Sequence, residues 1–134
     1  MNFFASWCEY CKTEVAGLGE LDREYKTQGV EIIGITYDFE HPDGSGVQTQ
    51  PSPDGILHHP SLPNALHIFL HENSASYIVI SNTPGFAASF GSINAIPTTF
   101  LFDRQGTLIK QYFGPPSMTV LKTDVQKLLT RAGN

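Results

Sequence analysis

Residues 3–12 read FFASWCEYCK, and this stretch contains the only two cysteines of the chain. An apolar run precedes Cys8, and a long pattern typical of a helix begins after it. Cys11 lies one helical turn further along, so the two thiols can close a small disulfide within the first turn of that helix. The stretch therefore predicts a buried strand that leads into a helix, with a redox-active cysteine pair between them.

The bulk properties favour a single domain over residues 1–134. The chain is 40% apolar and 16% charged, with a net charge of −5 and a pI of about 5.4. No basic residues cluster, which argues against a nucleic-acid partner, and no apolar run approaches the ~20 residues of a membrane span. Met1 leads directly into the predicted strand, so we expect the chain to be truncated at its N-terminus, where an export signal or anchor would lie.

The first part of the chain has the pattern of a strand–helix–strand unit. Residues 2–5 are expected to end a buried strand, residues 9–28 to form a helix that stops at Gly29, and residues 30–37 (VEIIGITY) to form a second strand. A unit this short implies a right-handed crossover and a parallel pair of strands. The helical residues with core spacing are Val15, Leu18, Leu21 and Tyr25.

The middle of the chain predicts a long loop followed by short elements. Residues 38–63 are rich in proline and glycine, and long loops in compact domains are usually functional or mobile. A helix is expected at 62–73, a strand at 77–80 and a short helical turn at 84–91. The helix and strand form an insertion before the last part of the chain.

The last part of the chain predicts a hairpin and a helix. Strands are expected at 98–102 and 107–113, joined by a turn at 103–106, and Ser117 is expected to cap a helix that ends near Arg131. The order of elements predicts an α/β fold whose mixed sheet starts parallel, ends in an antiparallel hairpin and carries helices on both faces. The expected core residues of the last helix are Val120, Leu121, Val125, Leu128 and Leu129.

The two cysteines hold chemically different positions. A thiolate is the nucleophile in disulfide exchange, and the unpaired N–H groups and dipole of a helix N-terminus favour an anion. We therefore expect Cys8 to attack a substrate disulfide and Cys11, one turn further in and more buried, to resolve the mixed disulfide. A pair of inert core cysteines fits poorly with a tryptophan directly before the pair, a strand upstream and a helix downstream.

Two motifs resemble those of the thioredoxin superfamily. Residues 3–12 are similar to its active-site segment, and residues 95–103 (AIPTTFLFD) are similar to its second signature, a cis-proline loop that leads into a strand. The resemblance covers essentially the whole chain apart from residues 38–63 and implies a thioredoxin fold with a cis proline at Pro97. In that geometry the backbone of Ile96 can pair with an extended substrate segment beside the cysteines.

Within this superfamily the chain resembles the TlpA/ResA-type branch. The helix and strand expected within 62–80 match its central insertion, Glu14 stands in a typical Cys-Lys-x-Glu context, and Asn2 replaces the buried Asp usual in cytosolic thioredoxins. The resemblance implies a reductase of protein disulfides outside the cytoplasm, which in several members serves cytochrome c maturation. It also implies a membrane thiol electron donor and no bound cofactor, and we expect a monomer.

Glu14 also has a physical case of its own. It lies three positions past Cys11, so the two side chains share a helix face. A partly buried carboxyl group there would have a raised pKa and could exchange a proton with the Cys11 thiol. On spacing alone an exposed Glu near the helix N-terminus explains the position equally well, and the family resemblance favours the functional interpretation.

The residues beside the cysteines are candidates for substrate contact. We expect Trp7 and Tyr10 to flank the disulfide as an apolar contact surface, although core packing explains Trp7 equally well. Glu9 and Tyr10 form the dipeptide between the cysteines, which tunes the redox potential. A negative Glu9 opposes a thiolate on Cys8, which suits neither an extreme oxidant nor an extreme reductant.

A group of histidines requires a separate interpretation. His58, His59, His67 and His71 lie close together in the sequence, and the last two are four apart on the predicted helix, a spacing that can bind a metal. Surface position, loop polarity and chance explain the group more simply, so we predict no metal site. The alternatives to a reductase are a thiol oxidase or disulfide isomerase, a non-catalytic thioredoxin-like binding module, and a metal chaperone.

Overall fold

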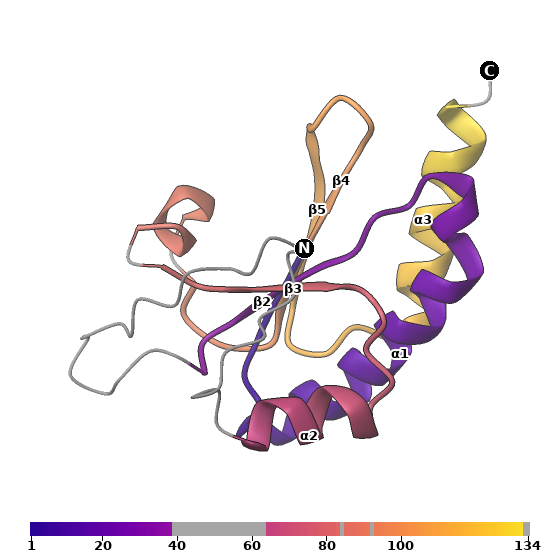
Figure 1. Ribbon diagram of the computed structural model, residues 1–134. Helices are drawn as coiled ribbons and strands as arrows, with labels where there is room; N and C mark the ends of the chain where they lie inside the picture. Colours follow the sequence, from indigo (N-terminus) through magenta and orange to yellow (C-terminus); the bar gives the residue numbers. More distant parts are fainter. Residues whose placement is uncertain (39–63, 84, 92, 133–134) are drawn as a thin grey trace.

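The computed structural model describes residues 1–38, 64–83, 85–91 and 93–132, and its centre is a five-stranded sheet in the order β3-β2-β1-β4-β5 (Figure 1). β1, β2 and β3 run parallel, whereas β4 is antiparallel to both β1 and β5. The predicted mixed sheet with a closing hairpin is therefore confirmed. The strands are β1 Asn2–Phe4, β2 Ile33–Thr36, β3 Ile78–Ser81, β4 Thr98–Phe102 and β5 Leu108–Phe113.

The central strand β1 leads directly to the cysteine pair. Phe3 lies opposite Ile35 of β2 on one side and opposite Thr98 of β4 on the other. Hydrogen bonding at both edges fixes the point at which the chain leaves the sheet toward Cys8. Sites in open α/β sheets commonly lie at the carboxyl ends of strands, and the cysteine pair follows the carboxyl end of β1.

Three helices cover one face of the sheet, and a short helix lies on the other (Figure 1). The covering helices are α1 Glu9–Tyr25, α2 Asn64–Glu72 and α3 Met118–Ala132. A 3-10 helix, η1 Lys26–Gln28, continues α1, and a second one, η2 Ala87–Phe90, lies on the opposite face. Helical elements on both faces agree with the sequence-based prediction.

Each face of the sheet has its own apolar core, because successive strand residues point to opposite faces. Phe4 belongs to the core under α1, α2 and α3, where its ring stacks on Phe69 with centroids 5.9 Å apart. Phe3 belongs to the other core, where Phe90 and Phe100 lie at centroid distances of 5.5 and 5.8 Å. Burial on both faces explains why residues 3–5 are apolar without alternation.

The predicted core face of helix α1 is confirmed, and close packing explains one of its glycines. At Gly19 a Cβ atom would lie 2.5 Å from the carbonyl oxygen of Ser74, so glycine permits the turn after α2 to pack closely. Gly29, with a φ of 87°, ends η1 in the left-handed conformation, as predicted for a stop signal. The predicted core residues Val15, Leu18, Leu21 and Tyr25 are all buried.

One core assignment on the last helix is wrong. Val120 is 45% exposed, although it was expected to face the core. The buried stripe of α3 instead runs through Leu121 and Val125, which lie one turn apart. Val120 directly precedes Leu121 and is therefore rotated by about 100° around the helix axis, away from that stripe.

The strand predicted at residues 30–37 is shorter in the structure. β2 has four residues: all four pair with β3, and the last three also pair with β1. The predicted loop at 38–63 lies outside the described residues from its second position on. Among the described helices, none combines the length and the apolar character that crossing a membrane requires.

Candidate active site

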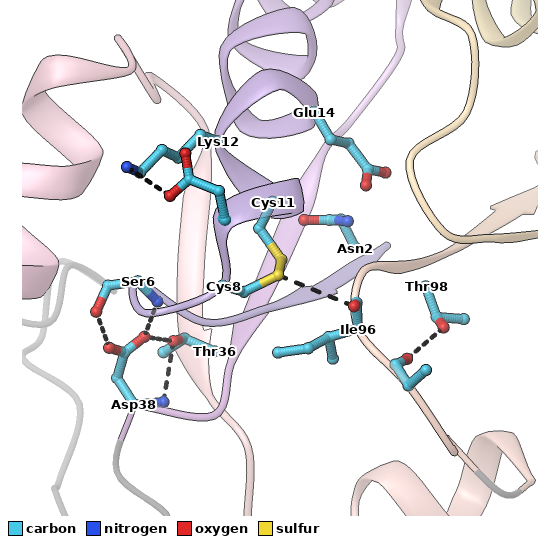
Figure 2. Close-up of a disulfide and its surroundings, with 12 residues drawn as sticks. Asn2, Ser6, Cys8, Cys11, Lys12, Glu14, Thr36, Asp38, Ile96 and Thr98 are labelled. Carbon is cyan, nitrogen blue, oxygen red and sulfur yellow. Dashed lines mark hydrogen bonds and ion pairs between the residues drawn. A yellow bond between two sulfur atoms is a disulfide. The ribbon is translucent and has the colours of Figure 1, made fainter.

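The cysteine pair forms a disulfide at the first turn of α1 (Figure 2). Cys8 occupies the N-cap position in extended backbone conformation, and the Cys11 N–H donates to the Cys8 carbonyl oxygen at 3.1 Å. The two Cα atoms lie 5.3 Å apart, within the usual range for a disulfide. Cys8 is 7% exposed and Cys11 is fully buried, so Cys8 is the member of the pair that solvent reaches, as predicted.

A tight turn precedes the pair and carries an exposed aromatic side chain. The Cys8 N–H donates to the Ala5 carbonyl oxygen at 3.2 Å, so Ser6 and Trp7 are the central residues of a β-turn. The side chain of Trp7 is 72% exposed, and that of Tyr10 is 73% exposed. This exposure excludes core packing as the role of Trp7 and places two aromatic side chains beside the disulfide.

The loop before β4 lies against the outer sulfur atom. The Ile96–Pro97 peptide bond is cis, as the resemblance implies, and Cys8 Sγ lies 3.9 Å from the Ile96 carbonyl oxygen (Figure 2). A disulfide sulfur carries no proton, so this contact becomes a thiol–carbonyl hydrogen bond only after reduction. The Thr98 hydroxyl donates to the Ala95 carbonyl oxygen at 2.7 Å and holds the loop. The structure thus brings Ile96 and Pro97 beside Cys8.

Glu14 is buried, and its carboxyl group is directed toward β4 rather than toward the sulfur atoms (Figure 2). Glu14 Oε1 accepts a hydrogen bond from the Thr99 hydroxyl, whose oxygen accepts one from Asn2 Nδ2 at 3.0 Å. We call these three residues the Glu14 network. Burial raises the pKa of Glu14 to about 7, and the Thr99 hydrogen bond opposes this rise. The carboxyl group is therefore poised to exchange a proton near neutral pH.

Two oxygen atoms of the Glu14 network lack a hydrogen-bond partner within the described part of the chain. Glu14 Oε2 and Asn2 Oδ1 are buried, and neither has a hydrogen-bond partner among the residues that the structure describes. An unpartnered buried carboxyl oxygen disfavours the charged form, which agrees with the raised pKa. The role of Thr99 was missed from the sequence, where it appears only as one of two threonines in a strand. The feature that could have indicated this role is the alternation of side chains along β4, which places Thr99 on the face of the sheet that α1 covers.

A second polar network lies on the Cys8 side, and the sequence interpretation did not include it. The carboxylate of Asp38 accepts hydrogen bonds from the Ser6 N–H at 2.8 Å, from the Ser6 hydroxyl and from the Thr36 hydroxyl (Figure 2). We call these residues the Asp38 network. The available signal was an acidic residue just after β2, because the carboxyl ends of neighbouring parallel strands meet at one edge of a sheet.

Phe113 is a further exposed aromatic residue near the cis-proline loop, and the sequence interpretation gave it no role. It is 79% exposed and lies opposite Thr98 in the β4–β5 pair. The N–H of the next residue, Gly114, donates to the Pro97 carbonyl oxygen at 2.9 Å. The end of β5 therefore adjoins the loop that faces the cysteines.

The charge of the dipeptide between the cysteines is balanced by a neighbour. Glu9 Oε2 lies 2.9 Å from Lys12 Nζ, and both side chains are exposed. Exposed ion pairs of this kind are weak and are screened by salt. The expected opposition of Glu9 to a thiolate on Cys8 is therefore partly offset by Lys12.

The histidine group is only partly described. His67 and His71 are exposed on α2, whereas His58 and His59 lie outside the described residues. Within the described ranges, no three His, Cys, Asp or Glu side chains are grouped in a way that could hold a metal ion. The interpretation of the full group stays a prediction.

Comparisons with known sequences give a family and distant relatives. The AhpC/TSA family matches residues 1–111. The chain is 24% identical over 129 residues to the thiol-disulfide oxidoreductase ResA of Bacillus thuringiensis (strain Al Hakam). This match covers 96% of this chain and 61% of that protein. The chain thus spans about three fifths of the length of this curated relative.

Solved structures show the same fold. A thiol:disulfide interchange protein of the thioredoxin family from Chlorobium tepidum TLS has a TM-score of 0.70 and 26% identity, and the match covers 96% of this chain and 77% of that chain. A thiol-disulfide isomerase from Corynebacterium glutamicum has a TM-score of 0.67 and 20% identity, with the same coverage of 96% and 77%. The predicted thioredoxin fold is confirmed by these structures.

Proposed function

This chain belongs to the AhpC/TSA family, and from that membership we propose that it is a thiol–disulfide oxidoreductase that reduces disulfides of other proteins. One observation carries the proposal: the Cys8–Cys11 disulfide lies at a helix N-terminus, against a cis-proline loop. That geometry exposes one sulfur atom to a partner and keeps the second sulfur atom beside it. The names of the relatives support the same chemistry.

The proposed cycle starts from the reduced pair. The Cys8 thiolate attacks one sulfur atom of the substrate disulfide, forms a mixed disulfide and releases the other substrate sulfur as a thiolate. Cys11 then loses its proton and attacks Cys8 Sγ, which releases the second substrate thiolate and closes the Cys8–Cys11 disulfide. Two electrons pass to the substrate, whose two thiolates take up two protons. The N-terminus of α1 stabilises the Cys8 thiolate.

The exposed residues around the pair define where a substrate would lie. An extended substrate segment would pair with the Ile96 backbone beside Pro97, in the manner of strand addition. The exposed rings of Trp7 and Tyr10 would contact apolar side chains of that segment. This surface suits a flexible polypeptide stretch around the substrate disulfide better than the closed surface of a folded domain.

Glu14 is proposed as the group that accepts the Cys11 proton during resolution. Both residues are buried on the same helix, and a pKa of about 7 allows Glu14 to take and return a proton at neutral pH. The Thr99 hydroxyl donates to Glu14 Oε1, so Oε2, which has no hydrogen-bond partner among the described residues, is the oxygen atom that would take the proton. The raised pKa supports this role, and a kinetic separation of attack and resolution would test it.

The compartment and the redox partner are also part of the proposal. We propose that the protein works outside the cytoplasm, where protein disulfides form and persist, and that a membrane thiol protein returns electrons to the Cys8–Cys11 pair. The resemblance to TlpA/ResA-type proteins supports both points. The same resemblance suggests apocytochrome c as a substrate, since its haem-attachment motif carries two cysteines that can pair.

The direct test is to trap the reaction halfway. In Cys11→Ser only the first attack can occur, so the protein should accumulate a mixed disulfide with its partner on Cys8, which non-reducing electrophoresis and mass spectrometry would identify. Cys8→Ser is the matched control and should trap nothing. Trapping on Cys11 in the control would overturn the assignment of the two roles. Insulin reduction that survives in Cys8→Ser would overturn the enzymatic proposal and favour a binding module.

The direction of the reaction is tested by the reduction potential. A reductase should equilibrate with reduced and oxidised thiol buffers at a potential well below that of a strong oxidant, which is ~−120 mV. A measured value near that of a strong oxidant would favour the thiol oxidase alternative instead. The measurement uses the wild-type protein and its single tryptophan, Trp7, whose fluorescence reports on the adjacent cysteine pair.

A further inference from the structure

The Asp38 network joins the active-site turn to the sheet. One carboxylate oxygen of Asp38 accepts from the Ser6 hydroxyl, and the other accepts from the Ser6 N–H at 2.8 Å and from the Thr36 hydroxyl (Figure 2). Both oxygen atoms are thus occupied by donors. Hydrogen bonds to an ionised acceptor are shorter and stronger than neutral ones.

The two ends of this network differ in burial. Thr36 is fully buried and is the last residue of β2, where it pairs with Phe4 of the central strand. Ser6 lies in the β-turn between Ala5 and Cys8 and directly precedes Trp7. The carboxylate therefore ties a turn at the surface to a buried, strand-paired point of the sheet.

Within the described part of the chain, the centre of the turn makes few other contacts. Trp7, its second central residue, is 72% exposed, so its side chain contributes little packing. The turn closes through a hydrogen bond from the Cys8 N–H to the Ala5 carbonyl oxygen at 3.2 Å. Its orientation relative to the cis-proline loop determines where Cys8 Sγ and the Trp7 ring meet a substrate.

We propose that Asp38 is a positioning residue, which holds the turn of Ser6 and Trp7 so that Cys8 Sγ and the Trp7 ring face the substrate together. Its carboxylate bonds to Ser6 and Thr36, and it acts through the Ser6 backbone and hydroxyl. The inference rests on the proposed oxidoreductase function for its catalytic consequence. Its structural part, that Asp38 sets the conformation and mobility of the turn, can be measured without any substrate.

Asp38→Asn is the informative substitution. It keeps the size of the side chain but replaces one acceptor oxygen by an NH₂ group, which must face a donor of Ser6 or Thr36. The turn should loosen, so the fluorescence anisotropy of Trp7 should fall and its quenching by acrylamide should rise. The rate constant for reduction of a disulfide peptide by the reduced protein should fall about tenfold, the effect of losing one charge-assisted hydrogen bond.

Milder variants separate positioning from general stability. Thr36→Val removes the hydroxyl donor from the sheet side, and Thr36→Ser retains it, so the serine variant should restore wild-type Trp7 anisotropy and rate. Ser6→Ala removes only the hydrogen bond from the Ser6 hydroxyl to Asp38. This variant replaces Asp38→Asn in the same measurements if the Asp38→Asn protein does not fold. In the double variant of Ser6→Ala and Asp38→Asn the effects on Trp7 should be less than additive, because both disturb the same contact.

The outcomes are distinguishable from a failure of the proposed function. If the wild-type protein reduces no disulfide, the functional proposal fails, whereas Trp7 anisotropy and the alkylation rate of Cys8 by iodoacetamide still test the role of Asp38. An Asp38→Asn protein that unfolds more easily but keeps wild-type Trp7 anisotropy, alkylation pH profile and reduction rate would show a merely structural contact. That result would overturn the inference.

Discussion

Two polar networks flank the disulfide, and they differ in how completely their oxygen atoms are bonded. In the Asp38 network both carboxylate oxygens accept hydrogen bonds. In the Glu14 network one carboxyl oxygen and the Asn2 amide oxygen have no partner among the described residues. A carboxylate surrounded by donors fixes the groups that bind it, whereas a buried carboxyl group with an unbonded oxygen readily carries a proton. The comparison supports the two proposed roles, positioning on the Cys8 side and proton transfer on the Cys11 side.

The largest effect that bears on this comparison is expected from the cysteines themselves. Cys8→Ser should lower the rate of disulfide reduction by more than about 1,000-fold, because it removes the proposed nucleophile. Cys11→Ser should keep the first attack at near the wild-type rate and stop at the mixed disulfide. Stopped-flow measurement of the first attack distinguishes the two variants. Equal loss of the first attack in both would mean that the two sides of the site are not chemically separate.

Glu14→Gln should affect resolution and spare attack. Without a proton acceptor, the attack of Cys11 on the mixed disulfide should slow on the order of 100-fold, the lower end of general-base effects. The attack of Cys8 should stay within about twofold of wild type, since the Glu14 network does not touch Cys8. Single-turnover kinetics with a chromogenic disulfide resolve both steps.

A matched control for this variant is available on the same helix. Glu9→Gln removes an exposed carboxylate of α1 that pairs with Lys12, so resolution should remain near wild type. If Glu9→Gln and Glu14→Gln slowed resolution equally, the effect would come from charge near the helix start. The buried network would then lose its special role in proton transfer.

The stability of the oxidised protein should depend on pH through Glu14. Its pKa is about 7 in the folded protein against an ordinary value of 4.5, with burial as the main cause. Between these values the folded state holds a proton that the unfolded chain has released. The stabilising contribution is therefore complete below about pH 4.5 and is lost as pH rises to about 7, a loss of about 3 kcal/mol in the free energy of unfolding.

Two variants check this pH dependence in denaturation experiments on the disulfide form. In Glu14→Gln the free energy of unfolding should not show this loss between pH 4.5 and 7. Thr99→Val should extend the decline to higher pH, because the Thr99 hydrogen bond lowers the pKa of Glu14. A wild-type protein and a Glu14→Gln protein with parallel pH profiles would contradict the buried, protonated state of the carboxyl group.

Local sequence patterns predicted the fold and the cysteine site well. Residues 3–12 indicate a strand that leads into a helix, and the structure contains both, joined by a β-turn that the sequence did not predict. The hairpin of β4 and β5 was also predicted from a short stretch, two strand patterns joined by a turn. Pro97 was placed correctly as cis because of a family resemblance, since X-Pro bonds are cis in only about 5–6% of folded cases.

The two networks could not be predicted in the same way, because their contacts depend on register. Ser6 and Asp38 are 32 positions apart, and Glu14 and Thr99 are 85 apart. Which residues meet depends on the pairing of Phe4 with Thr36 and of Asn2 with Thr99. Single-sequence patterns show the face of an element, but they do not show how far one strand is shifted against another.

The smallest effect is expected at the charged surface outside both networks. Lys12→Ala removes the partner of Glu9 at the first turn of α1 and leaves an uncompensated negative charge near Cys8. Alkylation of reduced Cys8 by iodoacetamide at neutral pH should slow about twofold at low salt, and the difference should vanish at about 1 M salt, where exposed charges are screened. The double variant of Glu9→Gln and Lys12→Ala should return to the wild-type rate. A loss that exceeds the effect of Asp38→Asn, or that persists at high salt, would show that surface charge rather than the Asp38 network governs the reactivity of Cys8.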